Sequence, residues 1–455
     1  MVHRVEDGSD EVQKPAHGHQ YYSVFCASLA VFSIGTILGY ASPATFQLRR
    51  PIPSTNNTSE ILPYNTSDFT SYDEQQSNDD YNFTLSNSEI NWFSSAFSIG
   101  ALIGGMISAV LMCRLGRRGT MLAMSVPSLA GWLLIGLGRS FGLLFAGRLL
   151  TGVYTGIGSV VINTYIAEIA SADIRGILGS GFNVMFSCGV VFAYFIGSLT
   201  TWDKLAFICI IPPMLSCVLM FFNHESPTHL VAKGKVDQAM KTLQHFRGPY
   251  YNVLEELSAL ERAQHDASKQ RRSLADFKRP SVYKPLIIVI MLMVLLQLSG
   301  VYALGFNLAT IFKSSGSEMS PYGSTVLVAV VQTVVSVPAA PLVDFAGRKV
   351  LLIFSSVIMM LCQGCLGLYF YCLQSSPEWT IQYWWWVPII SVMTFIIGFS
   401  MGIGPIGWIL MGELFPINVR ETAISICVAV NWSASFFVIH YFQSLQFYLH
   451  DYGVY

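Results

Sequence analysis

The sequence has 455 residues, of which 53% are hydrophobic and only 12% are charged, and its formal net charge is −1. This balance is typical of an integral membrane protein, and the near-neutral charge gives no support to a nucleic-acid partner. Nine cysteines are scattered, mostly inside apolar runs, so no disulfide framework is predicted. The pair Cys362 and Cys365 has the spacing of a redox motif, but it lies within an apolar run, where we interpret it as small packing residues.

Apolar runs long enough to cross a bilayer recur along the chain, after a polar segment 1–20 that does not resemble a cleavable signal. Those in the first part of the chain span 21–43, 91–112, 120–138, 141–167, 177–199 and 203–222. Those in the second part span 284–308, 323–343, 350–373, 385–411 and 421–442. We therefore predict an all-α membrane protein with eleven spans, in bundles covering 21–222 and 284–455, and a cytoplasmic tail at 1–20.

The first loop, 45–89, carries clustered N-glycosylation sequons in "NNTS", "NTS" and "NFT". The candidate acceptors are Asn56, Asn57, Asn65 and Asn82. We expect this loop to lie outside the cell and to be glycosylated. A further sequon at Asn431 lies inside a span and is interpreted as a chance match.

The segment 223–283 is polar, and apolar residues such as Leu230, Leu243 and Leu257 recur in it at three- and four-residue steps. This pattern predicts short amphipathic helices on the cytoplasmic surface, which link the two bundles.

Basic residues gather in the loops on one side of the membrane, which the positive-inside rule assigns to the cytoplasm. The two most similar loops read "RLGRRG" and "DFAGRKV", and their glycines Gly116 and Gly347 are about 230 residues apart. Each loop lies between the second and third spans of its half. This repetition is typical of transporters whose two parallel halves surround a central site.

Several motifs in the same order resemble the sugar porter branch of the major facilitator superfamily. They are the two basic loops, "GRLLTGVYTG", "YIAEIASADIRG", "ESPTHLVAKGK", "QLSG" and "GPIGWILMGELFPINVR", and "LGYASPA" is similar to the insect facilitated trehalose transporters within that branch. The resemblance implies the major facilitator fold, with two pseudo-symmetric bundles, and sugar transport by alternating access. It implies a multi-pass plasma-membrane protein with a cytoplasmic N-terminus, in contact with lipid, without a cofactor, a metal or an obligate protein partner.

The resemblance also implies a sugar site built from neutral amides and one indole. These residues are Asn183, Gln297, Gln332, Trp408 and Asn431, with Asn307 and Tyr165 as weaker candidates. Buried amides need partners, so hydrogen bonding between helices is the alternative role for any one of them. The chain departs from the family at Leu296, Tyr302 and Ser400, where Gln, Asn and Glu are usual, and trehalose, a hexose or another polyol stay open as substrates.

An ionic network that holds the cytoplasmic side shut is a further implication of the resemblance. Its members are Arg114, Arg117, Arg118, Glu168 and Arg175 in the first half and Asp344, Arg348, Glu413 and Arg420 in the second. Cys113 stands where the family has Asp, so we expect a weaker network in the first half. A topology signal without a gating role is the alternative.

The position of charged residues bears on energy coupling. No Asp or Glu lies in the middle of a predicted span, and Ala41 stands where proton-coupled relatives have Asp, which favours facilitated diffusion over proton symport. Arg148, inside the fourth span, is expected to serve structure or gating. The sequence has no nucleophile–base set, metal-ligand cluster or phosphate-binding loop, so an enzyme is not expected.

The end of the sequence raises a second reading. The fold implies twelve spans, but the residues after the eleventh are too few and too polar for another. With the departures at Cys113, Leu296 and Tyr302, this leaves a transport-inactive relative that senses sugar, or has degenerated, as the alternative to a working transporter.

Overall fold

The computed structural model describes residues 15–49, 83–171, 173–269, 277–315, 320–415 and 419–454. Helices make up nearly all the regular structure in these ranges, apart from one isolated bridge between Arg49 and Leu85. The predicted all-α fold is confirmed. The expected glycosylation sites fall within 50–82 and lie outside the described residues.

The helices before the linker form what we call the first half. They are α1 (Gly18–Gly39), α2 (Ala41–Leu48), α4 (Asn87–Leu137), α5 (Phe141–Ile169), α6 (Arg175–Leu199), α7 (Trp202–Ile208) and α8 (Ile211–Phe221). A capping box starts α4: the Ser86 hydroxyl accepts from the Glu89 N–H at 3.3 Å, and the Glu89 carboxylate accepts from the Ser86 N–H at 2.8 Å. Within α4, Gly116 has φ 81°, a backbone conformation that glycine adopts without strain, and it separates two spans.

The helices after the linker form the second half. They are α12 (Pro280–Leu298), α13 (Val301–Ser314), α14 (Pro321–Ala346), α15 (Arg348–Ser375), α16 (Pro377–Trp384), α17 (Val387–Met401), α18 (Ile403–Glu413) and α19 (Arg420–Val454). Two spans are interrupted. Gly300, with φ 74°, lies between α12 and α13, and Gly402 lies between α17 and α18. The second break is the one that the glycine-rich segment "GFSMGIGPIGW" predicts.

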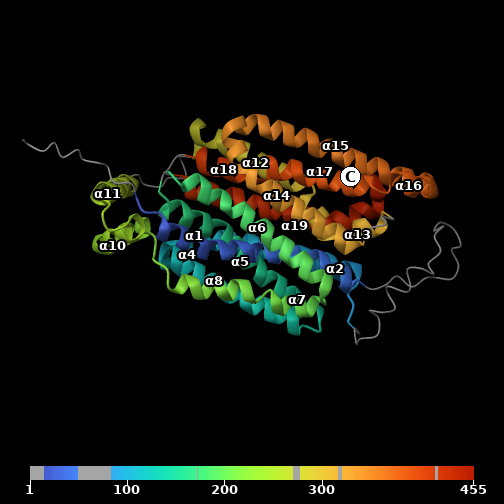
Figure 1. Ribbon diagram of the computed structural model, residues 1–455, viewed down its shortest axis with the longest axis horizontal. Helices are drawn as coiled ribbons and strands as arrows, with labels where there is room; N and C mark the ends of the chain where they lie inside the picture. The colour runs from blue at the N-terminus through green and yellow to red at the C-terminus, as the bar shows by residue number, and fades with distance from the viewer. Residues whose placement is uncertain are drawn as a thin grey trace, which may run out of the picture.

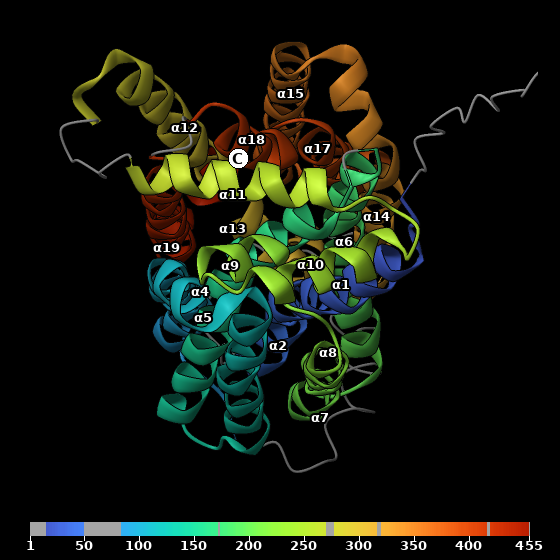
Figure 2. The same cartoon turned by 90° about the vertical axis from the view of Figure 1, so that its left-hand side faces the viewer.

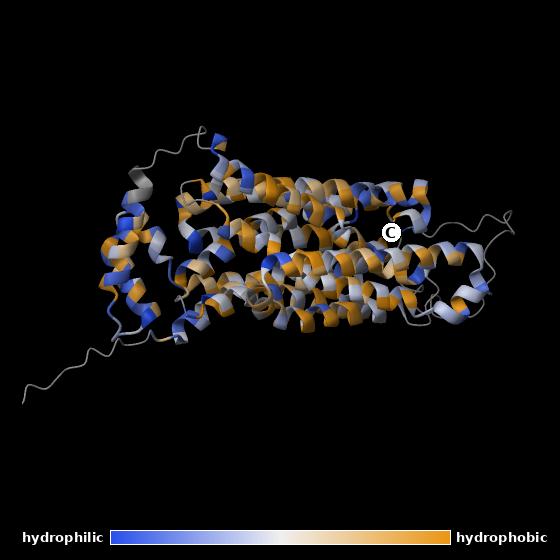
Figure 3. Ribbon diagram, turned by 90° about the horizontal axis from the view of Figure 1, so that it is seen from above, coloured by the Kyte–Doolittle hydropathy of each residue, from blue (hydrophilic) through white to orange (hydrophobic). Residues whose placement is uncertain are grey.

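The two halves lie side by side along a common long axis (Figure 1). Ten stretches of the described chain are long and apolar enough to cross a membrane, and α4 contains two spans on either side of Gly116. Each of the eleven predicted spans therefore corresponds to one helix, to a pair of helices, or to the part of α4 on one side of Gly116. Hydrophobic residues cover much of the bundle, and the helices at one end are more hydrophilic (Figure 3).

Those hydrophilic helices belong to the linker, which comprises α9 (Pro227–Ala232), α10 (Val236–Arg247) and α11 (Leu254–Lys269). They lie across one end of the bundle (Figure 2), which we call the linker end; the opposite end is the far end. Their apolar faces form a small separate core of Leu230, Val231, Ala239, Leu243, Val253 and Leu257. The predicted amphipathic surface helices are therefore present.

The main apolar core is shared by the two halves. The larger cluster joins Phe97 and Trp132 of the first half to Met293, Phe306 and Trp432 of the second. A second cluster joins Val190 and Tyr194 of α6 to side chains of α13, α15 and α17. The interface between the halves is therefore apolar along much of its area, so its few polar groups are conspicuous.

Candidate functional site

Two buried amides, Gln297 of α12 and Asn431 of α19, form a pair inside the second half. Gln297 stands near the end of α12, next to the helix break, and its Nε2 donates a hydrogen bond of 2.9 Å to Asn431 Oδ1 of α19. The two residues are 1% and 0% exposed. Gln297 Oε1, Asn431 Nδ2 and Trp432 Nε1 are buried and have no hydrogen-bond partner in the described part of the chain. The site therefore keeps one free acceptor and two free donors, each costing roughly 1–3 kcal/mol while unpaired.

Trp432, which follows Asn431 in α19, packs among other aromatic rings. Trp432 stacks on Tyr302 with ring centroids 6.3 Å apart and an interplanar angle of 17°, and it meets Phe97 edge-on at 5.5 Å. Trp408 is half-buried and packs against the same apolar cluster. A few polar groups among flat apolar faces are what a small polar ligand with an apolar face requires.

Two other predicted amides lie apart from this pair. Asn183 of α6 is exposed, one helical turn from Ser187 and on the face that carries Val190 and Tyr194. Gln332 of α14 is half-buried. Within the described residues, no hydrogen bond joins either side chain to Gln297 or Asn431. The structure thus brings two of the predicted amides into direct contact, and Trp408 packs against the main apolar core.

The weaker candidates have other partners. The amide of Asn307 donates to Ala303 O of its own helix at 2.9 Å. The hydroxyl of Tyr165 donates to His224 O, in the connector between α8 and the linker, at 2.8 Å. Each of these side chains therefore already has one backbone partner.

The basic loop of the first half is held by carboxylates at the linker end. Arg117 forms an ion pair of 2.7 Å with Glu168, whose other oxygen accepts a short hydrogen bond from Ser226. Glu225 accepts from the backbone N–H groups of Arg117 and Arg118 at 2.7 and 3.2 Å. The charge-assisted bonds therefore tie the loop to both α5 and the connector.

The other basic residues of this half bond mainly to backbone. Arg118 donates to Met220 O at 3.2 Å, and Arg175 donates to Ala170 O at 3.2 Å, so both cover helix C-termini. Arg114 and Cys113 are exposed. No ion pair of Arg114 is present in the described part of the structure.

The second half has a parallel but more exposed arrangement. Arg348 and Glu413 form an ion pair of 2.9 Å with side chains 35% and 44% exposed, and Arg420 donates to Phe415 O at 3.2 Å. The side chain of Asp344 lies outside the described residues. Each of the two ion pairs lies within a single half, so neither joins the halves directly.

Hydrogen bonds do join the halves toward the far end. Thr45 Oγ1 donates to Phe306 O at 3.3 Å, and the Ala309 N–H donates to Ser42 Oγ at 3.4 Å. The Tyr194 hydroxyl donates to Gly305 O at 3.1 Å. We call these contacts of α2 and α6 with α13 the far-end seal.

Arg148 is fully buried next to this seal. Its Nη1 donates to Ile37 O at 3.0 Å, while Nε and Nη2 have no partner in the described part of the chain. Its guanidinium carbon lies 5.3, 5.4 and 6.0 Å from the ring centroids of Phe93, Phe97 and Phe306. Since Phe306 belongs to the second half, these cation–π contacts also cross between the halves.

Comparison with known proteins identifies the family. A family model described as "Sugar (and other) transporter" matches residues 21–455. The chain belongs to this family of membrane transporters. It is 34% identical to the mouse protein "Solute carrier family 2, facilitated glucose transporter member 8", over 98% of this chain and 89% of that one. It is 31% identical to "Facilitated trehalose transporter Tret1" of Apis mellifera ligustica, over 96% of this chain and 81% of that one.

Solved structures confirm the transporter fold. The xylose transporter XylE from E. coli, in a partially occluded inward-open conformation, superposes with a TM-score of 0.73 at 22% identity, covering 93% of this chain and 91% of XylE. The proton:xylose symporter XylE bound to 6-bromo-6-deoxy-D-glucose gives a TM-score of 0.74 at 24% identity, covering 96% and 92% of the two chains. The major facilitator fold that the motifs imply is therefore confirmed.

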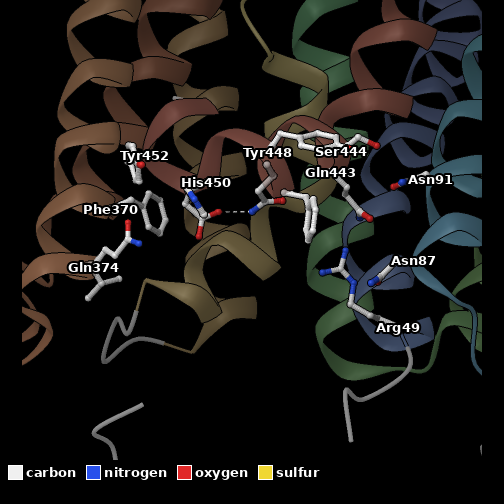
Figure 4. A pocket seen from close by; sticks show the side chains of 14 residues that line it. Arg49, Asn87, Asn91, Phe370, Gln374, Gln443, Ser444, Tyr448, His450 and Tyr452 are labelled. Atoms are coloured by element: carbon white, nitrogen blue, oxygen red, sulfur yellow. Dashed lines mark hydrogen bonds between the residues drawn. The ribbon is translucent and has the colours of Figure 1, made fainter. Parts of the chain in front are cut away.

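A large open pocket of the transporter lies at the far end, not at the amide pair (Figure 4). Its volume is about 730 Å³. Arg49, Asn87 and Asn91 line it from the first half, and Gln443 and Tyr448 from the second. These residues lie at the far ends of α2, α4 and α19, and we call the pocket between them the vestibule.

Sequence reasoning did not select several of the residues that hold this transporter together. Glu225 and Ser226 lie in "ESPTHLVAKGK", a motif that carried the family resemblance without a role for its acid. Trp432 directly follows the selected Asn431. His440 bonds through Nδ1 with Ser95 Oγ of the first half at 3.1 Å. His440 is a polar residue inside a predicted apolar span, and this feature of the sequence could have identified it as a candidate.

Proposed function

We propose that this transporter carries a neutral sugar, a hexose or trehalose, by facilitated diffusion. The observation that supports this most is the set of unpaired buried atoms Gln297 Oε1, Asn431 Nδ2 and Trp432 Nε1. A sugar hydroxyl both donates and accepts, so two or three hydroxyls can satisfy these atoms without bringing a charge into the membrane. The names of the glucose and trehalose transporter relatives agree with such a ligand.

Alternating access is the transport mechanism that we propose, with the bundles 21–222 and 284–455 moving against each other. The far-end seal closes one side, and it depends on a few hydrogen bonds of Ser42, Thr45 and Tyr194. Each bond of this kind stabilises by about 0.5–1.5 kcal/mol, which a bound sugar can offset. The ion pairs at the linker end would stabilise that end of each bundle. They would thereby favour the state that is closed at the linker end and open at the far end.

The orientation follows from the charge distribution. The basic loops and the linker lie at one end, which we propose faces the cytoplasm together with the N-terminal tail 1–20. The far end and the loop 45–89, with its glycosylation sequons, would then face outward from the plasma membrane. A sugar arriving from outside would meet the vestibule first.

Coupling to protons is disfavoured by the surroundings of Arg148. The guanidinium bonds to a backbone carbonyl and to aromatic faces, and no carboxylate pairs with it in the described residues. Arg148 therefore has no carboxylate partner among the described residues that could bind and release a proton beside it.

Uptake of labelled glucose and trehalose into proteoliposomes, with and without a proton gradient, tests this proposal. We expect saturable uptake that equilibrates and does not depend on the gradient. Accumulation of sugar driven by an acidic exterior would contradict facilitated diffusion and indicate proton symport. A correctly folded protein that binds sugar but does not equilibrate it across the membrane would contradict transport and indicate a sensor.

A further inference from the structure

Three histidine rings from separate parts of the chain stack at the linker end. His19 lies in the first turn of α1, His224 in the connector after α8, and His245 in the last turn of α10. The centroid of the His245 ring is 4.1 Å from that of His19 and 4.1 Å from that of His224. The His245 ring thus contacts both other imidazoles, at interplanar angles of 38° to His19 and 28° to His224.

The stack lies beside the hydrogen bonds that dock α10 on the first half. Gln20 Nε2 donates to Phe246 O at 3.0 Å, and the Ala16 N–H donates to Arg247 O at 2.7 Å. Arg247 in turn donates to Ile169 O, at the end of α5, at 2.8 Å. The two residues after His245 therefore hold α10 in place, and a displacement of His245 would strain those bonds.

Charged groups around the stack have other partners or add positive charge. Arg247 pairs with Glu256 at 2.6 Å, and His17 pairs with Asp173 at 3.1 Å. The positive charge of Arg118 lowers the pKa of His224. Among the described residues no carboxylate forms an ion pair with any of the three rings. A proton added to the stack would therefore meet cations or other imidazoles.

We propose that His19, His224 and His245 form a proton-sensitive clasp, which keeps α10 docked on the first half while its rings are neutral and releases it on acidification of that side of the membrane. Protonated rings about 4 Å apart repel one another, and the half-buried His245 has less water around it to screen that repulsion than a free side chain has. The clasp concerns docking of the linker and does not depend on the identity of the transported sugar.

The direction of the pKa shifts of His245 and His224 agrees with this geometry. Burial, followed by the neighbouring His224 and His19, lowers the pKa of His245 to about 4. Desolvation, followed by Arg118 and His19, lowers the pKa of His224. A released ring returns toward its ordinary pKa near 6.5, so the released state binds more protons and docking weakens as the pH falls below that value. For His245 alone, docking weakens about threefold between pH 7.4 and 6.0.

Release would also reach the basic loop. The residues that follow His224 are Glu225 and Ser226, which hold the backbone of Arg117 and the carboxylate of Glu168. A freed connector would loosen that network, so acid on the linker side would weaken the contacts that hold the basic loop of the first half.

Hydrogen–deuterium exchange of the full chain in lipid nanodiscs tests the clasp, with rates corrected for the intrinsic effect of pH. We expect exchange of the α10 amides to rise about threefold from pH 7.4 to 6.0. His245→Gln and His245→Asn should hold α10 docked without this rise. His265→Gln, which changes an exposed histidine of α11 outside the stack, should keep it.

Three outcomes would overturn the proposal. One is a wild-type chain without the rise, and another is a rise of equal size in both His245 variants. The third is fast exchange in both variants already at pH 7.4, since ring packing and not protonation would then hold α10.

Discussion

The hydroxyl of Tyr194 on α6 donates a hydrogen bond of 3.1 Å to the backbone carbonyl of Gly305 on α13 and so joins the two halves at the far end. Tyr154 makes a similar bond, also 3.1 Å long, to Ala30 O, but within the first half. Two buried tyrosines thus make the same kind of hydrogen bond, one between the halves and one within the first half.

Removal of the Tyr194 hydroxyl should therefore favour the state that is open at the far end. The Tyr194→Phe variant loses a net 0.5–1.5 kcal/mol of sealing, which corresponds to a shift of about two- to tenfold in the equilibrium. Faster hydrogen–deuterium exchange in α13 would report the shift. Tyr154→Phe is the matched control and should change overall stability without favouring exchange in α13; equal effects of the two variants would remove Tyr194 from the seal.

Substitution of Gln297 tests the sugar site. Gln297→Leu removes one free acceptor and leaves Asn431 Oδ1 without its donor, so we expect KM for sugar to rise about three- to tenfold. The control is Asn163→Leu on α5, because the Asn163 amide is exposed and bonds only to Ser159 O of its own helix. Unchanged uptake kinetics in Gln297→Leu, at equal expression, would show that the Gln297–Asn431 bond only holds the helices together.

The two ion pairs at the linker end should differ in strength. The Arg117 and Glu168 side chains are 14% and 15% exposed, whereas those of Arg348 and Glu413 are 35% and 44% exposed. Glu413→Gln should cost about 0–1 kcal/mol, as for exposed pairs, and Glu168→Gln should cost more, because it leaves Arg117 largely buried without a counter-charge. Melting temperatures of the two variants in one detergent would rank them, and an equal loss would contradict the argument from burial.

An acid at position 113 should strengthen the basic loop of the first half. Cys113 is exposed beside the unpaired Arg114, so Cys113→Asp supplies a nearby carboxylate. We expect the population open at the far end to rise, by at most about fivefold, since exposed pairs contribute about 0–1 kcal/mol. Distances between spin labels at the far ends of the halves would measure it. Cys113→Asn should have no effect, and a matching shift in that variant would rule out a charge effect.

A single acid in α2 should introduce proton dependence. Ala41 is fully buried one helical turn after Ile37, whose carbonyl accepts from Arg148. In Ala41→Asp, a carboxylate would lie close to the free Nε and Nη2 of Arg148 and could bind and release a proton. We expect uptake that is insensitive to external pH in the wild type and in Ala41→Asn, and stimulated by external acid in Ala41→Asp. Identical pH profiles in the two variants would contradict this.

Much of the architecture is readable in the sequence because a bilayer imposes simple rules. A span needs about 20 apolar residues, so the eleven runs could be located without any knowledge of packing. The break at Gly402 follows from a glycine-rich segment, and the paired basic loops around Gly116 and Gly347 indicate two related halves. The amphipathic linker follows from its three- and four-residue steps in the same way.

Contacts between residues far apart in the chain needed the folded molecule. Sequence reasoning selected the amides as one set, yet only Gln297 and Asn431 bond to each other, while Asn183 is exposed and Tyr165 is tied to the connector. The roles of Glu225 in the basic loop and of the stacked His19, His224 and His245 were not foreseen, because nothing in a local pattern says which loop will meet which helix end.

The sequence by itself determined that this protein is a multi-span helical transporter of the sugar family, since hydropathy, loop charge and motif order are local properties of the chain. Only the tertiary structure decided which polar groups keep free hydrogen-bonding atoms in the interior and which end of the bundle is sealed. The physical reason is that a buried polar atom takes its role from its partners, and in this bundle those partners often come from helices more than a hundred residues away.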